Sequence, residues 1–279
     1  MTNLTSLTNS TQGEIIEERL TFPSGKLTLS GILAYPESAE PARAVLLCSP
    51  HPHFAGDMNN NVVRALARHL AADGLTLRFD YRGVGESEIK LPPQASAFDY
   101  WHDIEETKDY RDALDDVQAA ASELRRVSPE LPLTVIGYSF GAVTALRHGG
   151  VSEAVHSMVG ISPPLTRVGL DFLAGCPKRC LVLCGKNDFL YSPEEISKLK
   201  RVVGPAVAIE LLEGQDHFFR GEEECLCERV AKFVGVFGCR FSVVGGMTTC
   251  PTRQSQIENP KSKIEDEELV QCNWMRNLN

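Results

Sequence analysis

The chain has 279 residues, of which 43% are hydrophobic and 23% charged, and this balance excludes a chain that is disordered throughout. Its length suits one large α/β domain. The net charge of −9 and the scattered basic residues exclude a typical nucleic-acid-binding protein, which needs a basic stripe to displace counterions from phosphates.

The two ends of the chain differ in composition from its middle. The first 13 residues are rich in Thr, Asn and Ser and hold neither Lys nor Arg, so they match neither a secretory signal nor a transit peptide. No later segment approaches the roughly 18 uninterrupted apolar residues of a membrane-spanning helix. We therefore expect a cytoplasmic protein with no membrane span. A domain at 14–237 should lie between two mostly disordered tails, 1–13 and 238–279.

Strand and helix patterns alternate along this domain. Two alternating segments near its start predict a pair of antiparallel strands at one edge, and the later apolar runs predict buried parallel strands. The predicted strands are 14–21, 27–35, 44–48, 75–79, 133–136, 155–161, 180–184 and 207–212. Helical spacing predicts helices at 61–72, 109–127, 142–147, from about 193, and 222–237. Together they predict an α/β fold with a mostly parallel eight-stranded sheet covered by helices on both faces.

A serine follows the fifth of these strands, in the motif Gly137-Tyr138-Ser139-Phe140-Gly141. In a tight turn from strand to helix, small flanking residues allow a strained serine to expose its hydroxyl at the edge of the sheet. The start of the helix also supplies backbone N–H groups where an oxyanion would form. The motif predicts Ser139 as a nucleophile, against the simpler interpretation of an ordinary serine in a turn.

A serine nucleophile needs a base that is held in place by an acid. Asp188 and His217 each follow a later predicted strand, and the order Ser, Asp, His is typical of this architecture. Asp188 has the alternative role of a turn or helix-start residue. Asp216 is a competing acid, but it directly precedes His217 and reaches the ring of its neighbour with difficulty. The predicted catalytic residues are therefore Ser139, Asp188 and His217.

The loop after the third strand reads Ser49-Pro50-His51-Pro52-His53-Phe54. We expect it to supply one oxyanion donor from its backbone, with Phe140 supplying the other. Because Pro52 has no N–H, His53 or Phe54 is the expected donor. The histidine pair also suggests a metal, but no Asp, Glu or Cys completes a ligand set at matching spacing, so we predict neither a metal nor a cofactor.

Cysteine is frequent, with nine residues, and several lie within apolar runs, such as Cys48 and Cys184. These positions favour small buried hydrophobic side chains over disulfides. The group Cys176, Cys180 and Cys184 does not converge on one point if Cys184 lies on a strand, so we do not expect it to bind a metal.

On these residues the chain resembles the α/β-hydrolase superfamily over about 14–237. It is especially similar to small bacterial-type serine hydrolases with a His-Pro-His oxyanion loop. The turn Arg82-Gly83-Val84-Gly85-Glu86-Ser87 is similar to a turn that is usually structural in this superfamily. The resemblance implies the same nucleophile, acid and base at Ser139, Asp188 and His217. One departure is that the His-Gly loop of many esterases is absent.

These residues together predict a serine hydrolase that cleaves a small-molecule carboxylic ester or thioester through an acyl-enzyme. A peptidase or amidase with the same residues is the first alternative, because the fold does not select the acyl substrate. A binding protein without catalytic activity is the second. Only about 17 residues separate the strands at 155–161 and 180–184, too few for a large cap domain. The segment 89–102 is expected to form either a partial lid or a surface loop packed by its own aromatic residues.

Overall fold

The computed structural model describes residues 14–235 of the chain. The predicted tails, 1–13 and 238–279, therefore lie outside the described residues. Within 14–235, no helix is both long enough and apolar enough to cross a membrane.

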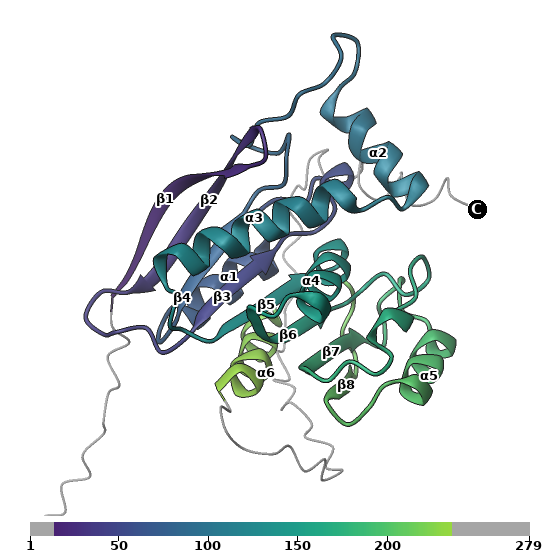
Figure 1. Ribbon diagram of the computed structural model, residues 1–279. Coiled ribbons are helices and arrows are strands. Elements are labelled where there is room, and N and C mark those ends of the chain that lie inside the picture. Colours follow the sequence, from purple (N-terminus) through teal and green to yellow (C-terminus); the bar gives the residue numbers. More distant parts are fainter. Residues whose placement is uncertain (1–13, 236–279) are drawn as a thin grey trace, which may run out of the picture. The chain divides into compact units, whose positions relative to one another are not determined.

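An eight-stranded sheet organises the described residues, in the order β1-β2-β4-β3-β5-β6-β7-β8 (Figure 1). Strand β2 pairs antiparallel with β1 and with β4, while every other neighbouring pair is parallel. The strands are β1 (Ile15–Ser24), β2 (Leu27–Pro36), β3 (Ala44–Cys48), β4 (Leu75–Phe79), β5 (Leu133–Tyr138), β6 (Val155–Ile161), β7 (Arg179–Gly185) and β8 (Val207–Leu212). The predicted sheet, including its antiparallel edge, is confirmed.

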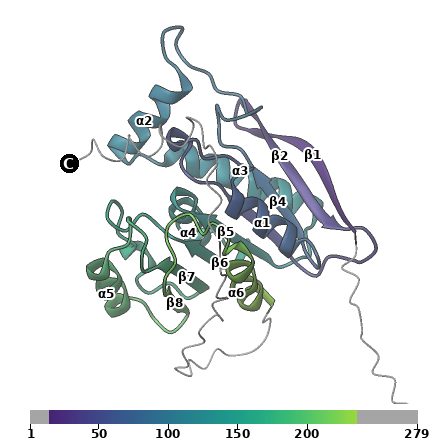
Figure 2. The same cartoon turned by 180° about the vertical axis from the view of Figure 1, so that it is seen from behind.

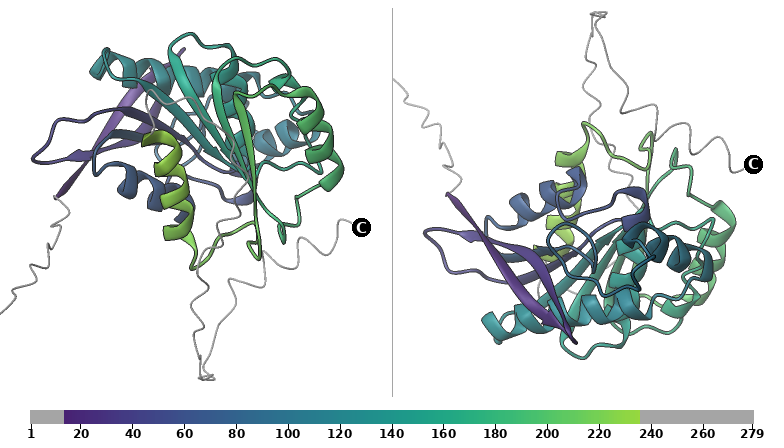
Figure 3. Two further views of the ribbon diagram at one scale, coloured as in Figure 1. Left: turned by 90° about the horizontal axis from the view of Figure 1, so that it is seen from below. Right: turned by 90° about the horizontal axis from the view of Figure 1, so that it is seen from above.

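Within 14–235, six α-helices and two short 3₁₀ helices connect the strands or follow the last one. They are η1 (Pro52–Phe54), α1 (Asn61–Leu70), α2 (Ala97–Thr107), α3 (Arg111–Val127), α4 (Phe140–Val151), η2 (Asp171–Leu173), α5 (Pro193–Val202) and α6 (Glu223–Gly235). Helices α1 and α6 lie together on one face of the sheet, and α3, α4 and α5 lie on the other (Figure 2; Figure 3).

Strand β3 shows how the sheet buries both of its faces. All five of its residues are buried, although successive side chains point to opposite sides. Ala44, Leu46 and Cys48 belong to the core under α3, whereas Val45 and Leu47 pack in the core under α1 and α6. A run of consecutive apolar residues is therefore the pattern that a central parallel strand requires.

The clearest difference from the predicted elements is α2. The segment 89–102 was expected to be a partial lid or a loop, and its second half is the first part of an eleven-residue helix. Ser96 begins this helix with a capping box, because its hydroxyl accepts from the Asp99 N–H and the Asp99 carboxylate accepts from the Ser96 N–H. In Figure 1, α2 stands at the top of the view, apart from the helices that cover the sheet. No large cap domain stands over the sheet within 14–235.

Candidate active site

Ser139 lies at the turn between β5 and α4, as the sequence predicts. Its backbone adopts φ 57° and ψ −118°, a conformation that costs a non-glycine residue about 1–3 kcal/mol. The turn is fixed on both sides: the Ser139 N–H donates to the Ile161 carbonyl at 2.8 Å, and the Ser139 carbonyl accepts from the Ala142 N–H at 3.0 Å. The strain is therefore held by the sheet and by the start of α4.

The two glycines of the motif are required by close backbone approaches. A Cβ atom on Gly137 would lie 1.9 Å from the Gly141 carbonyl oxygen, and one on Gly141 would lie 2.2 Å from the Cys48 carbonyl oxygen. Both distances are far below contact distance, and the opposing atoms belong to backbone that cannot turn away. The motif thus lets α4 begin directly against the ends of β5 and β3.

The three predicted catalytic side chains meet at the carboxyl edge of the sheet. His217 Nε2 lies 3.1 Å from Ser139 Oγ, and His217 Nδ1 lies 2.8 Å from Asp188 Oδ2. The second oxygen of Asp188 accepts from the Leu190 N–H at 2.8 Å, which fixes the carboxylate plane. The hydroxyl of Tyr138 donates to the His217 carbonyl at 2.6 Å. All three side chains are buried, so this arrangement can transfer a proton from the serine to the histidine.

The competing acid, Asp216, points elsewhere. Its carboxylate oxygen accepts from the N–H groups of Phe218 and Phe219, at 2.8 and 3.1 Å. Asp216 therefore caps the turn that presents His217, while Asp188 is the acid bonded to the ring.

Of the predicted oxyanion donors, Phe140 is in the better position. Phe140 and Gly141 are the first two residues of α4, and the Ala142 N–H is the first that bonds back to Ser139. N–H groups before that point have no intrahelical acceptor. The N–H groups of His53 and Phe54, by contrast, donate to His51: His53 to its ring Nδ1 at 3.1 Å, and Phe54 to its carbonyl at 3.0 Å.

His51 is the residue around which this loop is built. Its ring packs against Phe140, with centroids 4.4 Å apart, and against Trp101 of α2 at 5.6 Å. Because Nδ1 accepts a hydrogen bond, the neutral ring carries its proton on Nε2. Burial lowers the pKa of His51 from 6.5 to about 4, so the ring is neutral near pH 7. This role of His51 was not predicted, and its one signal in the sequence is Pro52 directly after it, because proline is favoured at the first position of a helix.

Helix α2 is attached to the same loop through a buried carboxylate. Glu105 Oε2 lies 3.6 Å from His51 Nε2, and its other oxygen pairs with Lys108 at 2.8 Å and with Arg167 at 2.5 Å. These cations lower the pKa of Glu105 against the opposing effect of burial. Arg167 comes from the segment after β6, so this pair ties α2 to a part of the chain 62 residues away. The sequence did not mark Glu105, because two of its three partners, His51 and Arg167, are distant in the chain.

Four of the cysteines lie in the interior of the protein. Cys48, Cys180, Cys184 and Cys227 are buried, as expected for small apolar side chains. Within 14–235, no three His, Cys, Asp or Glu side chains gather in a way that could hold a metal.

The turn that begins at Arg82 joins the edge of the sheet to α3. The Arg82 guanidinium bonds both oxygens of the fully buried Asp116, at 2.8 and 3.0 Å, and the Ser24 hydroxyl bonds the same carboxylate at 2.8 Å. This contact ties the turn to α3 and to the β1–β2 hairpin, which is a structural role.

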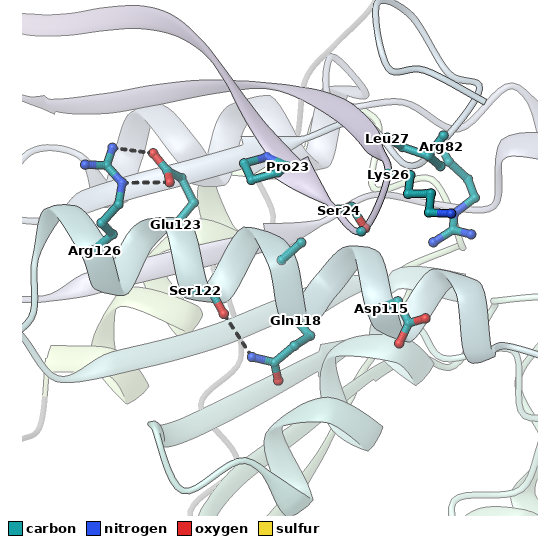
Figure 4. Close-up of a pocket in the computed structure, with 12 residues that line it drawn as sticks. Pro23, Ser24, Lys26, Leu27, Arg82, Asp115, Gln118, Ser122, Glu123 and Arg126 are labelled. Atoms are coloured by element: carbon teal, nitrogen blue, oxygen red, sulfur yellow. Dashed lines mark hydrogen bonds and ion pairs between the residues drawn. The ribbon is translucent and has the colours of Figure 1, made fainter. Parts of the chain in front are cut away.

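A groove of about 670 Å³ lies between the β1–β2 hairpin and α3 (Figure 4). None of its lining residues belongs to the Ser139 site. Four of its polar side chains pair with one another, Arg126 with Glu123 and Gln118 with Ser122. No histidine lines the groove, so it has no side chain in the role that His217 has beside Ser139.

Comparison with known proteins finds both a matching family and a relative of this chain. Residues 53–178 match the family described as serine aminopeptidase, S33. An uncharacterized protein of Rickettsia prowazekii, RP471, is 31% identical over 204 residues, which are 68% of this chain and 78% of that protein.

Solved structures share the fold at lower identity. An α/β serine hydrolase homologue from Coxiella burnetii is 23% identical, with a TM-score of 0.65, over 77% of this chain and 96% of its own. XC6422 from Xanthomonas campestris, described as an α/β serine hydrolase without a lid, is 24% identical with a TM-score of 0.65, over 78% and 94%. The esterase Pf2001 from Pyrococcus furiosus is 20% identical with a TM-score of 0.61, over 80% and 92%.

Proposed function

This chain belongs to the α/β-hydrolase superfamily, and from that premise we propose that it is a serine hydrolase that cleaves a carboxylic ester or thioester. The observation that carries the proposal is the connected set of Ser139, His217 and Asp188 at the carboxyl edge of the sheet. We place this activity in the domain 14–237.

The mechanism begins when Ser139 Oγ attacks the carbonyl carbon of the substrate. His217 Nε2 takes the serine proton at the same time, and Asp188 stabilises the resulting imidazolium through Nδ1–H. The proton on His217 then passes to the leaving group as the acyl-enzyme forms. Water, activated by the same histidine, hydrolyses the acyl-enzyme and frees Ser139. Every proton transfer is made by these side chains and water, so no cofactor is required.

The oxyanion is stabilised by backbone N–H groups. Phe140 supplies the first, since its N–H lies at the start of α4 beside Ser139. The loop supplies the second from His53 or Phe54. Both of these N–H groups have a local acceptor on His51, so one of them exchanges or shares this acceptor when the oxyanion forms.

A peptidase or amidase is the second candidate, favoured by the serine aminopeptidase description of the matching family. Ester and amide hydrolysis use the same nucleophile and base, so the two candidates differ in substrate and not in mechanism. Turnover of p-nitrophenyl esters against aminoacyl anilides separates them. We expect esters to be hydrolysed and anilides to be cleaved far more slowly.

The nucleophile is tested by Ser139→Ala, with Ser122→Ala on the exposed surface of α3 as the matched control. We expect Ser139→Ala to lower kcat for an activated ester by about 10⁴-fold or more. The control should keep its turnover and should still react with a fluorophosphonate at Ser139. Full turnover by folded Ser139→Ala would overturn the mechanism. A folded wild-type chain that neither reacts with the probe nor turns over any substrate would indicate a binding protein.

A further inference from the structure

Exposed aromatic rings are concentrated around Ser139. Within 14–235, three phenylalanines are exposed: Phe54 by 40%, Phe98 by 57% and Phe189 by 53%. Each contacts a histidine of the site. Exposed large apolar side chains cost solubility and usually mark a binding surface when they cluster. The position of these three therefore calls for a functional explanation.

One ring lies on the side of the catalytic histidine. Phe189 directly follows Asp188 in the chain, and the centroid of its ring lies 5.1 Å from that of His217. Phe218 lies 6.0 Å from Phe189 and extends the apolar surface beside it. Because His217 Nε2 is 3.1 Å from Ser139 Oγ, a group bound on Phe189 would be next to the reacting atoms.

Two rings lie on the side of the oxyanion loop. Phe54 is the last residue of η1, and its ring lies 5.6 Å from that of His51, which packs on Phe140 beside the nucleophile. Phe98 is in the first turn of α2 and lies 4.3 Å from His53. Exposed rings thus contact both the oxyanion loop and the catalytic histidine, and they are carried by segments far apart in the sequence.

The charges near these rings disfavour an anionic substrate. Asp99, Asp103 and Glu106 are exposed on α2, the helix that carries Phe98. The guanidinium of Arg167, which lies 5.8 Å from the Phe54 ring, is already paired with Glu105. A carboxylate bound beside His53 would meet the like charges of Glu105 and Glu106, and the guanidinium nearest the Phe54 ring is already paired.

We propose that the substrate presents uncharged apolar groups on both sides of its scissile bond, held by Phe54 and Phe98 on one side and by Phe189 on the other. This inference rests on the proposed serine hydrolase function. It assigns the three phenylalanines as specificity-determining residues. The substrate class is an ester or thioester of a medium-length alkyl or aryl acid with an apolar leaving group.

A substrate series tests the apolar preference. The p-nitrophenyl esters of acetate, butyrate and hexanoate differ only in acyl length, and the monoester of adipic acid has the six-carbon chain with a terminal carboxylate. From the burial of two or more methylene groups, kcat/KM should rise about tenfold from acetate to hexanoate. It should fall at least tenfold from hexanoate to the adipate monoester. Equal values for acetate and hexanoate, or for hexanoate and the adipate monoester, would overturn the inference.

Variants on each side of the serine identify the rings responsible. The variant on the acyl side, Phe98→Ala or Phe189→Ala, should lower kcat/KM for hexanoate about fivefold, mainly through KM, and by at least threefold more than for acetate. The variant on the leaving-group side should lower kcat/KM for both p-nitrophenyl esters to the same extent. Leucine at either position should restore most of the loss, because it retains apolar surface. Val151→Ala, at an exposed apolar residue at the C-terminal end of α4, is the matched control. It should leave the ratio of kcat/KM for hexanoate to kcat/KM for acetate unchanged. Equal losses for acetate and hexanoate in both variants would contradict the assignment.

Labelling rates separate a failure of this inference from a failure of the proposed function. A long-chain alkyl fluorophosphonate should modify Ser139 about tenfold faster than an ethyl analogue. Equal rates would overturn the apolar preference and leave the hydrolase intact. No labelling of the folded chain by either probe would overturn the hydrolase, and the substrate class with it.

Discussion

The two halves of the candidate site are built differently. On one side, Ser139, Asp188 and His217 follow β5, β7 and β8, and their side chains meet because the parallel strands end at one edge of the sheet. On the other side, the site consists of backbone N–H groups of η1, and these donate to His51 of the same loop. The order of the strands is enough to bring the three side chains together. The backbone N–H groups of η1, by contrast, are positioned only if other residues pack against the loop.

That support comes from His51 and α2. The His51 ring accepts a hydrogen bond from the His53 N–H and packs on Phe140. Its Nε2 lies 3.6 Å from the Glu105 carboxylate. The half with Ser139 thus depends on the sheet, and the half with η1 depends on a buried ring and a helix outside the sheet. Changes to the first half should stop the chemistry, and changes to the second should weaken it by degrees.

The largest effect is expected at the acid of the first half. Asp188→Asn should lower kcat by about 10⁴-fold, because an amide cannot stabilise the imidazolium and favours the wrong tautomer of His217. Asp216→Asn should cost less than about fivefold, since the amide oxygen still accepts from the N–H groups that Asp216 caps. Steady-state kinetics on one activated ester measure both. Similar losses in the two variants would mean that Asp216 shares the role of the acid.

The second effect concerns the ring that supports the oxyanion loop. His51→Ala should lower kcat/KM by about 100-fold, the size expected when one oxyanion donor is lost or misplaced. His51→Asn should recover at least tenfold of this, because its side-chain oxygen can accept from the His53 N–H as an N-cap. Thermal unfolding of both variants serves as the control for folding. If Asn were no better than Ala in two equally stable variants, the cap would not be the function of His51.

The titration of His51 gives a third, thermodynamic effect. Burial lowers its pKa to about 4, so between about pH 6.5 and 4 the unfolded chain binds a proton that the folded chain does not. The free energy of unfolding should therefore fall as the pH falls through this window, by at most about 3 kcal/mol from this group.

Urea unfolding at about pH 7.5 and at about pH 4.5 measures this effect. His51→Asn removes the titrating ring and should lose less stability than the wild type between these two pH values. Other titrating groups, such as the buried His148 and Asp80, are present in both proteins and cancel in the difference. Equal losses in both proteins would show that the ring takes up a proton in the folded state.

The smallest effect is expected where α2 meets the loop. Glu105→Gln removes the charge that pairs with Lys108 and Arg167, and both cations are exposed enough to turn toward water. We expect kcat/KM to fall by about tenfold or less and the Tm to fall by a few degrees. The control is Glu106→Gln, an exposed position on the same helix, which should change neither quantity. Identical behaviour of the two variants would mean that Glu105 does not support the site.

Much of the fold followed from local patterns of sequence. The apolar run at 44–48 and the other buried runs predicted strands whose bounds the structure matches closely, because a central parallel strand must be apolar on both faces. Helix α2 was not predicted. Its apolar residues are few, and Trp101 and Ile104 find their partners only in the folded core.

The sequence by itself determined the architecture and the three side chains at the strand ends. Periodicity fixes strands and helices, and the parallel sheet then brings the strand ends to one edge. Only the tertiary structure decided that Asp216 accepts from the N–H groups of Phe218 and Phe219, and that the N–H groups of His53 and Phe54 already have acceptors. The tertiary structure also decided the pairing of Glu105 with Arg167, which is 62 residues away. The physical reason is that hydrogen bonds of loops and pairs of buried charges depend on backbone angles and on distant neighbours, neither of which leaves a periodic pattern in the chain.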